Sequence, residues 1–562
     1  MSKTADVLII GAGPVGLMLA NLLGQQGVNV LLVEKSETLI DYPRAVGIDD
    51  EALRAMQTAG LVDEVLPHTI PDQKIYMVNG DRQILSEVNP TTREFGWPRR
   101  NGFVQPLVDR VLLDGLKRFP NTAVRFSTEV VDLLEDGEGV VATTERGEKL
   151  RARYVVAAEG GASRTRRQLG ISFDGETRPS DGIVIDVAND PIGTPHAVFG
   201  GDPKRSYASI ALPHGIRRWE FTLFESEDPS LVENDGYIHS LLAPHVPDPT
   251  KLEIIRRRVY RHHARVAGQF RVGSIFLAGD AAHVMPVVGG QGWNSGIRDA
   301  FNLAWKLGAV INGACGDALL ETYEMERMGH VKQMVAVSLG MAKEMTDHDP
   351  AKAAERDRIA ANRTPEEREA QKRQAFKPQP KFDKGVVVHT PLPSFKTLPA
   401  RDVPRMAGAI FPQPRVTNAE GVEMLLDDAT GQGWRVLMWN NNPMAFISAE
   451  RCAALAHLRA RLVLVVPKAQ LPWARRHAPA GVTVIGDLGG EPSLQAWFDA
   501  RPVGAVVVRP DHVVAAECLA QELDDVLARV LDAAHFCLPP DTRRSGQDDT
   551  PVPGAIMALD RF

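Results

Sequence analysis

A glycine-rich turn joins the first apolar run of this chain to its first helical pattern. Val7–Ile10 is typical of a buried parallel strand, and Gly11-Ala-Gly-Pro-Val-Gly16 follows it at once. Apolar side chains then recur at helical spacing, and a second apolar strand, Val28–Val33, ends at Glu34. The pattern predicts a βαβ unit with an acid at the tip of its second strand.

The glycines and Glu34 have separate predicted roles. Gly11 permits a tight turn, Gly13 lets a backbone approach a pyrophosphate, and Gly16 lets helix and strand pack closely. The helix N-terminus offers free N–H groups and a positive dipole end to phosphates, and Glu34 can accept hydrogen bonds from a ribose. This context predicts a dinucleotide site, with a tight turn that binds nothing as the alternative.

A second glycine-rich motif follows a later apolar strand. Strand Ile275–Ala278 leads into Gly279-Asp-Ala-Ala-His283, and Gly289-Gly-Gln-Gly-Trp-Asn294 then opens a helix with one apolar stripe. Asp280 can bind the ribityl hydroxyls of a flavin, and the helix N-terminus near Asn294 can face the flavin's pyrimidine edge. Read alone, Asp280 has a turn cap as its alternative role. His283 is more often a structural histidine than a catalyst.

Length and composition exclude several classes of protein. The chain has 562 residues, 44% of them hydrophobic and 24% charged, which predicts three or four structural units and excludes a disordered or collagen-like chain. The net charge of −7 disfavours a non-specific nucleic-acid binder. Glycines interrupt the apolar N-terminal stretch, so we expect no membrane span there. Four scattered cysteines without zinc or redox spacing suit a reducing cytoplasm.

Patterning along the chain predicts an α/β protein with four regions. Residues 1–175 and 271–345 form a Rossmann-like dinucleotide-binding domain. Short alternating segments in 176–270 indicate an inserted antiparallel sheet that binds substrate. The charged, then proline-rich stretch 346–404 predicts a helix and linker. Strands alternating with helical stretches over 405–562 indicate a separate small α/β domain.

The two motifs together resemble those of the class A flavoprotein aromatic monooxygenases, the p-hydroxybenzoate and phenol hydroxylase superfamily. Segments Ile40–Leu53, Glu94–Asn101 and Asp299–Lys306 extend the resemblance, and within the superfamily they are similar to the branch that hydroxylates 3-(3-hydroxyphenyl)propionate. The resemblance implies FAD as cofactor, NADH as a transient reductant, O2 and a phenolic substrate. It also implies that the C-terminal domain is thioredoxin-like without redox cysteines. A homodimer is compatible with the sequence, which does not determine the oligomeric state.

The resemblance assigns cofactor contacts position by position. The ADP-binding motif corresponds to the glycines and Glu34, Arg44 to an arginine at the phosphates, and Gln105 and Asp280 to ribityl contacts. The matched cofactor-binding residues are Gly11, Gly13, Gly16, Glu34, Lys35, Arg44, Gln105, Asp280, Gly292, Trp293 and Asn294. One departure is Glu159-Gly160, where the superfamily has Asp-Gly, so the role of Glu159 is open.

Hydroxylation ortho to a phenol is helped by a group that accepts the phenolic proton. Relatives carry an ionisable side chain two residues after Arg44, where this chain has Val46. Asp49 and Asp50 are nearby substitutes, and Tyr207 and His214 are other options from the inserted sheet. Asp49 has a helix N-cap as its alternative role, and Tyr207 and His214 have structural ones. Arg218 matches an arginine near the flavin and is a candidate anchor for the substrate carboxylate, with a surface arginine as the alternative.

The implied function is hydroxylation of 3-(3-hydroxyphenyl)propionate to its 2,3-dihydroxy product in aromatic compound degradation. One alternative keeps the fold and changes the substrate to a hydroxybiphenyl or a polyketide phenol. The other is a flavin-binding redox sensor without turnover.

Overall fold

The first sheet is built on the predicted βαβ unit. The computed structural model describes residues 4–373, 377–391, 405–490 and 492–537. Strand β1 (Thr4–Ile10) pairs in parallel with β2 (Val30–Val33) and with β11 (Lys149–Ala157), and the paired segments Val7–Ile10, Val30–Val33 and Tyr154–Ala157 are apolar and buried. The sheet is completed by β8 (Thr122–Arg125), β9 (Val130–Glu135), β10 (Val140–Thr144), β17 (Arg271–Val272) and β18 (Ile275–Leu277).

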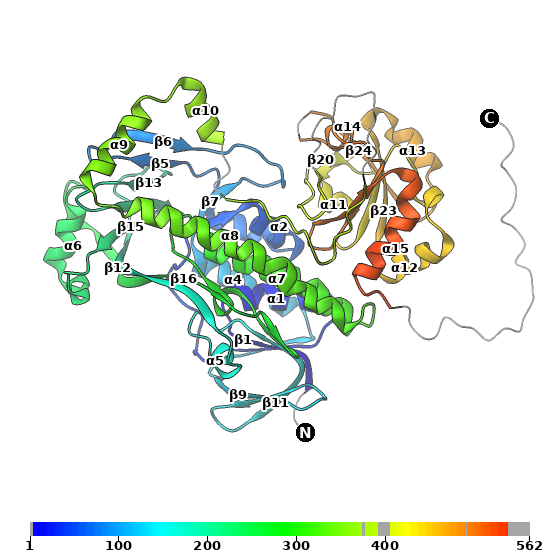
Figure 1. The fold of residues 1–562 in the computed structure, drawn as a ribbon, viewed down its shortest axis with the longest axis horizontal. Coiled ribbons are helices and arrows are strands. Elements are labelled where there is room, and N and C mark those ends of the chain that lie inside the picture. Colours follow the sequence, from blue (N-terminus) through cyan, green and yellow to red (C-terminus); the bar gives the residue numbers. More distant parts are fainter. Residues whose placement is uncertain (1–3, 374–376, 392–404, 491, 538–562) are drawn as a thin grey trace, which may run out of the picture.

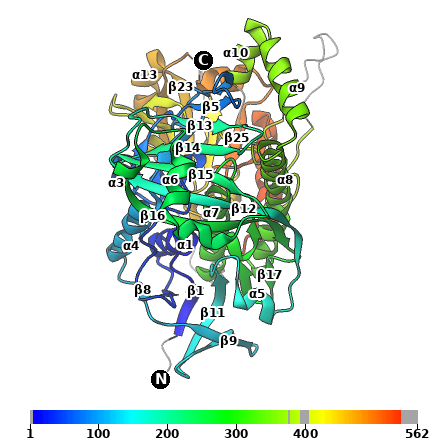
Figure 2. The same ribbon diagram turned by 90° about the vertical axis from the view of Figure 1, so that its left-hand side faces the viewer.

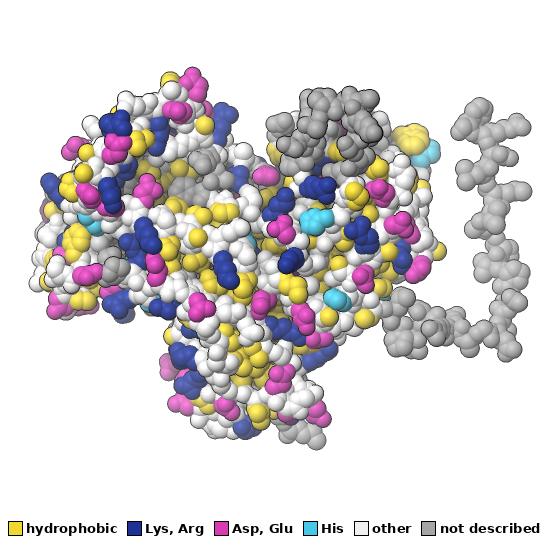
Figure 3. Space-filling view, viewed as in Figure 1, with side chains coloured by type: hydrophobic (Ala, Val, Ile, Leu, Met, Phe, Trp, Pro, Cys, Tyr) yellow, Lys and Arg dark blue, Asp and Glu magenta, His cyan; other side chains and the backbone are white. Residues whose placement is uncertain are grey.

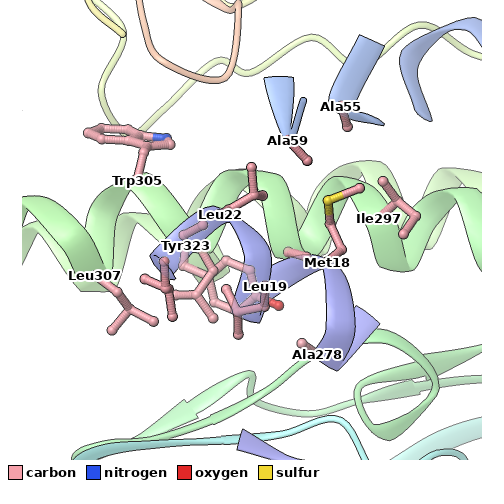
Figure 4. Close-up of a cluster of buried hydrophobic side chains, with 14 of the residues drawn as sticks. Met18, Leu19, Leu22, Ala55, Ala59, Ala278, Ile297, Trp305, Leu307 and Tyr323 are labelled. Atoms are coloured by element: carbon pink, nitrogen blue, oxygen red, sulfur yellow. The ribbon is translucent and has the colours of Figure 1, made fainter. Parts of the chain in front are cut away.

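The largest core lies where helices cover this sheet. Figure 4 shows Met18 and Leu22 of α1 (Pro14–Gln25) near Ile297 and Trp305 of α7 (Gln291–Ile311), together with Tyr323 of α8 (Thr322–Met345). All five side chains belong to one buried cluster. The apolar stripe predicted for α7 is therefore its core-facing side. The other helices of this part are α2 (Asp50–Thr58), α3 (Val62–Val65), α4 (Gln105–Gly115) and α5 (Arg164–Gln168).

The second sheet is antiparallel at its centre, as its alternating sequence predicts. Strand β12 (Phe173–Ala188) lies between β16 (Glu253–Ala267) and β15 (Ile216–Leu223), and α6 (Asp235–Leu242) covers one face. The remaining strands are β14 (Tyr207–Leu212), β13 (Ala197–Gly200), β5 (Ile75–Val78), β6 (Ile84–Val88) and β19 (His283–Val284). The sheet thus extends beyond the predicted range 176–270, because β5 pairs in parallel with β13 from far earlier in the chain.

Helices connect this sheet to the C-terminal part. In Figure 1, α8 runs across the molecule, and α9 (Pro350–Ala361) and α10 (Pro365–Arg373) follow beside β6. Figure 2 shows the second sheet face-on above the first. A small sheet of β3 (Gly47–Asp49), β7 (Arg100–Phe103) and β4 (Thr69–Ile70) lies between them. The first part of the predicted helix-and-linker region is therefore helical.

The C-terminal part has the predicted thioredoxin-like arrangement. Strands β22 (Arg435–Trp439) and β23 (Arg461–Pro467) are parallel, and β25 (Ala505–Val508) pairs antiparallel with β22 and with β26 (Val514–Cys518). The other elements are β20 (Arg415–Thr417), β21 (Glu423–Leu425), β24 (Val482–Asp487), α11 (Leu426–Thr430), α12 (Ala449–His457), α13 (Leu471–His477), α14 (Leu494–Asp499) and α15 (Leu523–Ala533). Its Cys452 and Cys518 are free thiols, so this domain has no disulfide among its described residues.

Charged side chains of both signs are interspersed on the face shown in Figure 3. Among the described helices, none is both long enough and apolar enough to span a bilayer.

A buried ion pair joins the C-terminal domain to the first domain. Arg54 of α2 donates to both carboxylate oxygens of Asp427, at 2.6 and 3.0 Å, and to the carbonyl oxygen of Phe411. Arg435 contacts the same carboxylate, and all three ionic side chains are at most 2% exposed. Burial alone would raise the pKa of Asp427, but the Arg54 and Arg435 guanidinium groups hold it well below its usual range.

We expect Asp427→Asn to destabilise the protein by about 3–5 kcal/mol, because two buried guanidinium groups would lose their anion. Urea unfolding followed by tryptophan fluorescence measures the loss. Asp428→Asn is the matched control: its exposed carboxylate accepts one hydrogen bond from Gln57, and an amide oxygen can keep that bond. The control should change stability by less than about 1 kcal/mol. Equal losses in the two variants would show that the Asp427 ion pair does not hold the domains together.

Candidate functional site

Of the three glycines in the first turn, only Gly13 has open space beside it. Gly11 has a φ of +108°, and a Cβ there would lie 2.4 Å from the carbonyl oxygen of Ala158. A Cβ on Gly16 would lie 2.0 Å from the carbonyl oxygen of Gly11, whereas one on Gly13 would meet nothing within 4 Å. Gly13 is also the N-cap of α1, whose first N–H groups have no partner within the helix. The turn therefore offers an accessible, electropositive helix end that fits a pyrophosphate.

Glu34 lies beside this turn, at the end of β2. Its two carboxylate oxygens accept hydrogen bonds from the backbone N–H groups of Ala12 and Ser36, both at 2.9 Å. These bonds fix the carboxylate next to the open helix end, and its remaining lone pairs can accept ribose hydroxyls. The neighbouring Lys35 is exposed.

The second motif is held by a buried carboxylate of α7. Asp299 accepts hydrogen bonds from the N–H of Gly279 at 3.0 Å, from His283 Nε2 at 2.6 Å and from Arg327 Nε at 2.8 Å. Burial alone would raise the pKa of Asp299, but His283 and Arg327 lower it to about 2. His283 is thus a structural partner of this carboxylate, and the contacts fix the turn that carries Asp280.

Three of the predicted cofactor residues converge although they are far apart in sequence. Arg44 donates to Asp280 at 3.3 Å, and both side chains are more than a third exposed. Gln105, the first residue of α4, accepts a hydrogen bond from the N–H of Ala45 at 2.8 Å and donates to Asp109. Burial raises the pKa of Asp109 to about 7. Arg44 and Asp280 thus face open space together, and Gln105 supports their backbone.

The N-terminus of α7 carries the second glycine-rich loop. Its N-cap, Gly290, has a φ of +65°, and a Cβ on Gly292 would meet only Met285, at 3.8 Å. Asn294 accepts a hydrogen bond from the N–H of Asp49 and donates to the carbonyl oxygens of Gly47 and Gly290. The Trp293 ring packs on Phe103, with centroids 5.0 Å apart, so only its backbone is available to a ligand. The free N–H groups of this first turn would stabilise a ligand group that carries negative charge.

Arg218 does not lie where a substrate anchor must lie. It is 1% exposed, it pairs with Asp186 at 2.7 and 2.9 Å, and it donates to the carbonyl oxygens of Pro43 and Arg44. Its donors are therefore occupied by protein. The prediction that Arg218 contacts substrate is corrected: this side chain positions the backbone that carries Arg44.

Tyr207 and His214 are not positioned to accept the phenol proton. Tyr207 lies opposite Phe221 on the face of the second sheet that α6 covers, and its ring centroid is 4.3 Å from that of His245. Arg218 lies on the other face because side chains alternate along β15. His214 pairs with His68 on the exposed surface, with ring nitrogens 3.1 Å apart. The structure therefore contradicts the prediction for Tyr207.

Both carboxylate oxygens of Asp49 also have partners within the protein. One oxygen caps α2 by accepting the N–H of Ala52 at 2.9 Å, and the other contacts Arg298 and Lys377. The helix-cap alternative is the one observed, and a proton-acceptor role for Asp49 is not supported. Sequence reasoning assigned no role to Arg298 or Lys377, because each lies more than 200 residues from Asp49 and no local spacing reveals the contact.

Glu159 makes local contacts. Its carboxylate accepts hydrogen bonds from the Ser163 hydroxyl at 2.6 Å and from the N–H of Thr165 at 3.1 Å. The side chain stabilises the start of α5.

Two protein families match this chain. Residues 4–338 match the FAD binding domain family, and residues 408–533 match the HcaD C-terminal domain family. Among solved structures, aklavinone-11 hydroxylase in complex with FAD and aklavinone superposes with a TM-score of 0.74 at 27% identity, covering 95% of this chain and 100% of that one. PieE, a flavin-dependent monooxygenase, shares the fold at 23% identity and a TM-score of 0.74, over 94% of this chain and 99% of that one.

Closer relatives are similar over almost the whole length. A protein of Mycobacterium sp. (strain JLS) named 3-(3-hydroxy-phenyl)propionate/3-hydroxycinnamic acid hydroxylase is 46% identical over 94% of this chain and 92% of its own. A Klebsiella pneumoniae (strain 342) protein of the same name is 44% identical, over 93% of each chain. With the two glycine-rich turns, these matches show that the chain is a member of the FAD-dependent aromatic hydroxylase family.

Proposed function

We propose that this enzyme hydroxylates 3-(3-hydroxyphenyl)propionate ortho to its hydroxyl group, with NADH and O2 as co-substrates. The product is 3-(2,3-dihydroxyphenyl)propionate. The observation that carries the proposal is the identity of 46% over 94% of the chain with a relative named for this substrate and for 3-hydroxycinnamic acid. Both named substrates are phenols with a carboxylate on a three-carbon chain, which sets the substrate class.

FAD, when bound, accepts a hydride and activates O2, and this chain supplies the contacts that hold and orient it. The N–H groups at the start of α1 would hold the pyrophosphate, and Glu34 the adenosine ribose. Arg44 would lie at the phosphates and Asp280 at the ribityl chain. The N–H groups at the start of α7 would stabilise negative charge on the flavin's pyrimidine edge.

The second sheet would separate the reacting atoms from water. Its face toward the first domain presents Ala208 and Ile210 to the apolar side chains of Val46 and Val104, and all four are buried. Arg218 ties this face to the backbone at Pro43 and Arg44, so the sheet keeps a fixed relation to that backbone. A dry, fixed cavity favours oxygen transfer to the substrate over unproductive loss of oxidant to water.

The proposal also names NADH as the reductant and the cytoplasm as the location. NADH is the reductant implied by the resemblance to the 3-(3-hydroxyphenyl)propionate branch. A reducing compartment is supported by Cys315, Cys452, Cys518 and Cys537, which are all free thiols.

We expect the enzyme to prefer 3-(3-hydroxyphenyl)propionate strongly over 3-ethylphenol, which keeps the ring and the hydroxyl but lacks the charge. A site built to pair a carboxylate leaves a buried cation unpaired when the ligand has none. NADH oxidation, O2 uptake and mass spectrometry of the products measure kcat/KM and the position of hydroxylation. Equal kcat/KM values on the two phenols would contradict the proposal and favour a neutral substrate.

Replacing Glu34 by alanine should weaken FAD binding by roughly 1.5–3 kcal/mol, the range for charge-assisted hydrogen bonds. The dissociation constant is measured by titrating apoprotein with FAD and following flavin fluorescence. Glu37→Ala, an exposed glutamate in the same loop, is the control and should bind FAD as the wild type does. Unchanged affinity in Glu34→Ala would remove the ribose contact from the proposed site.

A further inference from the structure

A small cavity adjoins the flavin-binding loop at the start of α7. It measures about 40 Å³, and its lining includes Gly47, Val88, Arg100, Gly290 and Lys377. A single water needs roughly 10–15 Å³ of such space, so the cavity has room for the two oxygens of a carboxylate. Apolar Val88 and the cations Arg99, Arg100 and Lys377 line it, and so does Asp49, whose carboxylate already contacts Lys377 and Arg298. Cations beside an apolar side chain suit the charged end of an otherwise apolar ligand.

Arg100 points into this cavity because of the alternation along β7. Phe103 packs on Trp293 in the core, so Arg100 and Gly102 lie on the opposite face of the strand. A Cβ on Gly102 would lie 3.1 Å from the carbonyl oxygen of Ala211, which places this face toward the second sheet. Arg100 Nη1 lies 3.5 Å from the position of a Cβ on Gly47, in the strand next to the α7 loop.

The Arg100 guanidinium has no anionic partner among the described residues. Its Nε is buried without a hydrogen bond. Burial lowers the pKa of Arg100 to about 10, and no neighbouring charge offsets this effect. In contrast, the most deeply buried arginines all pair with a carboxylate; these are Arg54, Arg217, Arg218, Arg327, Arg435 and Arg509.

The nearby carboxylates are occupied by other cations. Asp49 and Glu51 each contact both Arg298 and Lys377. Asp50 lies 3.5 Å from Lys377 and 3.7 Å from Arg99, and Arg99 also reaches the half-exposed Glu94 at 3.9 Å. These contacts leave Arg100 as the cation of the cluster without an anion. The carboxylate of a ligand would give Arg100 the anion that it lacks.

We propose that Arg100 binds the substrate carboxylate and sets the preference for phenolic acids over neutral phenols. The inference rests on the proposed function and names the residue behind its specificity. A guanidinium offers two parallel N–H donors to a carboxylate, and this geometry is favourable where water is excluded. Arg100 and the loop assigned to the flavin line the same cavity, and the proposal places the substrate carboxylate at Arg100 and the ring toward that loop.

The test compares Arg100→Gln, Arg100→Lys and a control, Arg93→Gln, whose arginine pairs with Asp72 at the surface. For each FAD-loaded protein, kcat/KM is measured on 3-(3-hydroxyphenyl)propionate and on 3-ethylphenol. The ratio of the two values cancels differences in folded fraction. A second readout needs no turnover: the flavin absorbance change gives dissociation constants for 3-phenylpropionate and for 3-ethylphenol.

In Arg100→Gln we expect the acid-to-phenol ratio, and the affinity for 3-phenylpropionate, to fall by about 10- to 100-fold, the equivalent of losing one charge-assisted contact. Binding of 3-ethylphenol should not change. Arg100→Lys should recover part of the loss, because it keeps the charge and loses the planar fork. Arg93→Gln should match the wild type.

Three outcomes would overturn the inference, and they can be told apart. If the wild type prefers the acid and Arg100→Gln keeps that preference, the proposed function stands and another residue binds the carboxylate. If Arg100→Gln loses FAD while its ratio is unchanged, Arg100 serves the cofactor. If the wild type itself does not distinguish the two phenols, the proposed function fails together with the inference.

Discussion

Helix α7 carries five buried polar side chains that contact other parts of the molecule. These are Asn294, Arg298, Asp299, Asn302 and Lys306, all at most 8% exposed. A buried charge without a partner costs several kcal/mol, so the surrounding elements must supply partners at fixed positions. The helix therefore fixes the positions of the strands and helices that pack around it.

These five side chains hold different elements. Asn294 and Arg298 hold β3 and the start of α2, and Asp299 holds the turn that carries Asp280. Lys306 and Asn302 contact Glu326 of α8, and Glu326 in turn pairs with Arg509 of the C-terminal domain. The domain without redox cysteines is thus joined through Glu326 to α7, the helix whose N-terminus is the proposed flavin contact. This arrangement gives it a structural role in keeping α7 in place.

The buried ion pairs also explain why some acidic residues are not available for catalysis or metal binding. Asp49, Asp50 and Glu51 lie close enough together to suggest a metal site, but Lys377 contacts all three carboxylates and Arg298 contacts two of them. Burial alone would raise the pKa of Glu51, and the cations Arg298 and Lys377 hold it well below its usual range instead. The same cations leave the neighbouring Arg100 as the group that needs an anion.

Motifs whose parts lie within a few residues of one another were predictable. Gly11, Gly13 and Gly16 require particular backbone angles or contact distances, and such requirements are visible in the residue types. The strand and helix periodicities likewise indicated the order of the domains. Pairing of β5 with β13 was not predictable, because register between distant strands is set by packing and not by local pattern.

The sequence by itself determined the two glycine turns and a separate small α/β domain at the end of the chain, because these depend on local backbone geometry and hydrophobic period. FAD and the thioredoxin-like class of that domain followed from the resemblance to the aromatic monooxygenases. Only the tertiary structure decided which ionisable groups are free. Arg218 meets Arg44 across 174 residues, and Lys377 meets Asp49 across 328. Among the described residues around Asp49, folding leaves Arg100 without a carboxylate, and that depends on contacts between segments that no spacing connects.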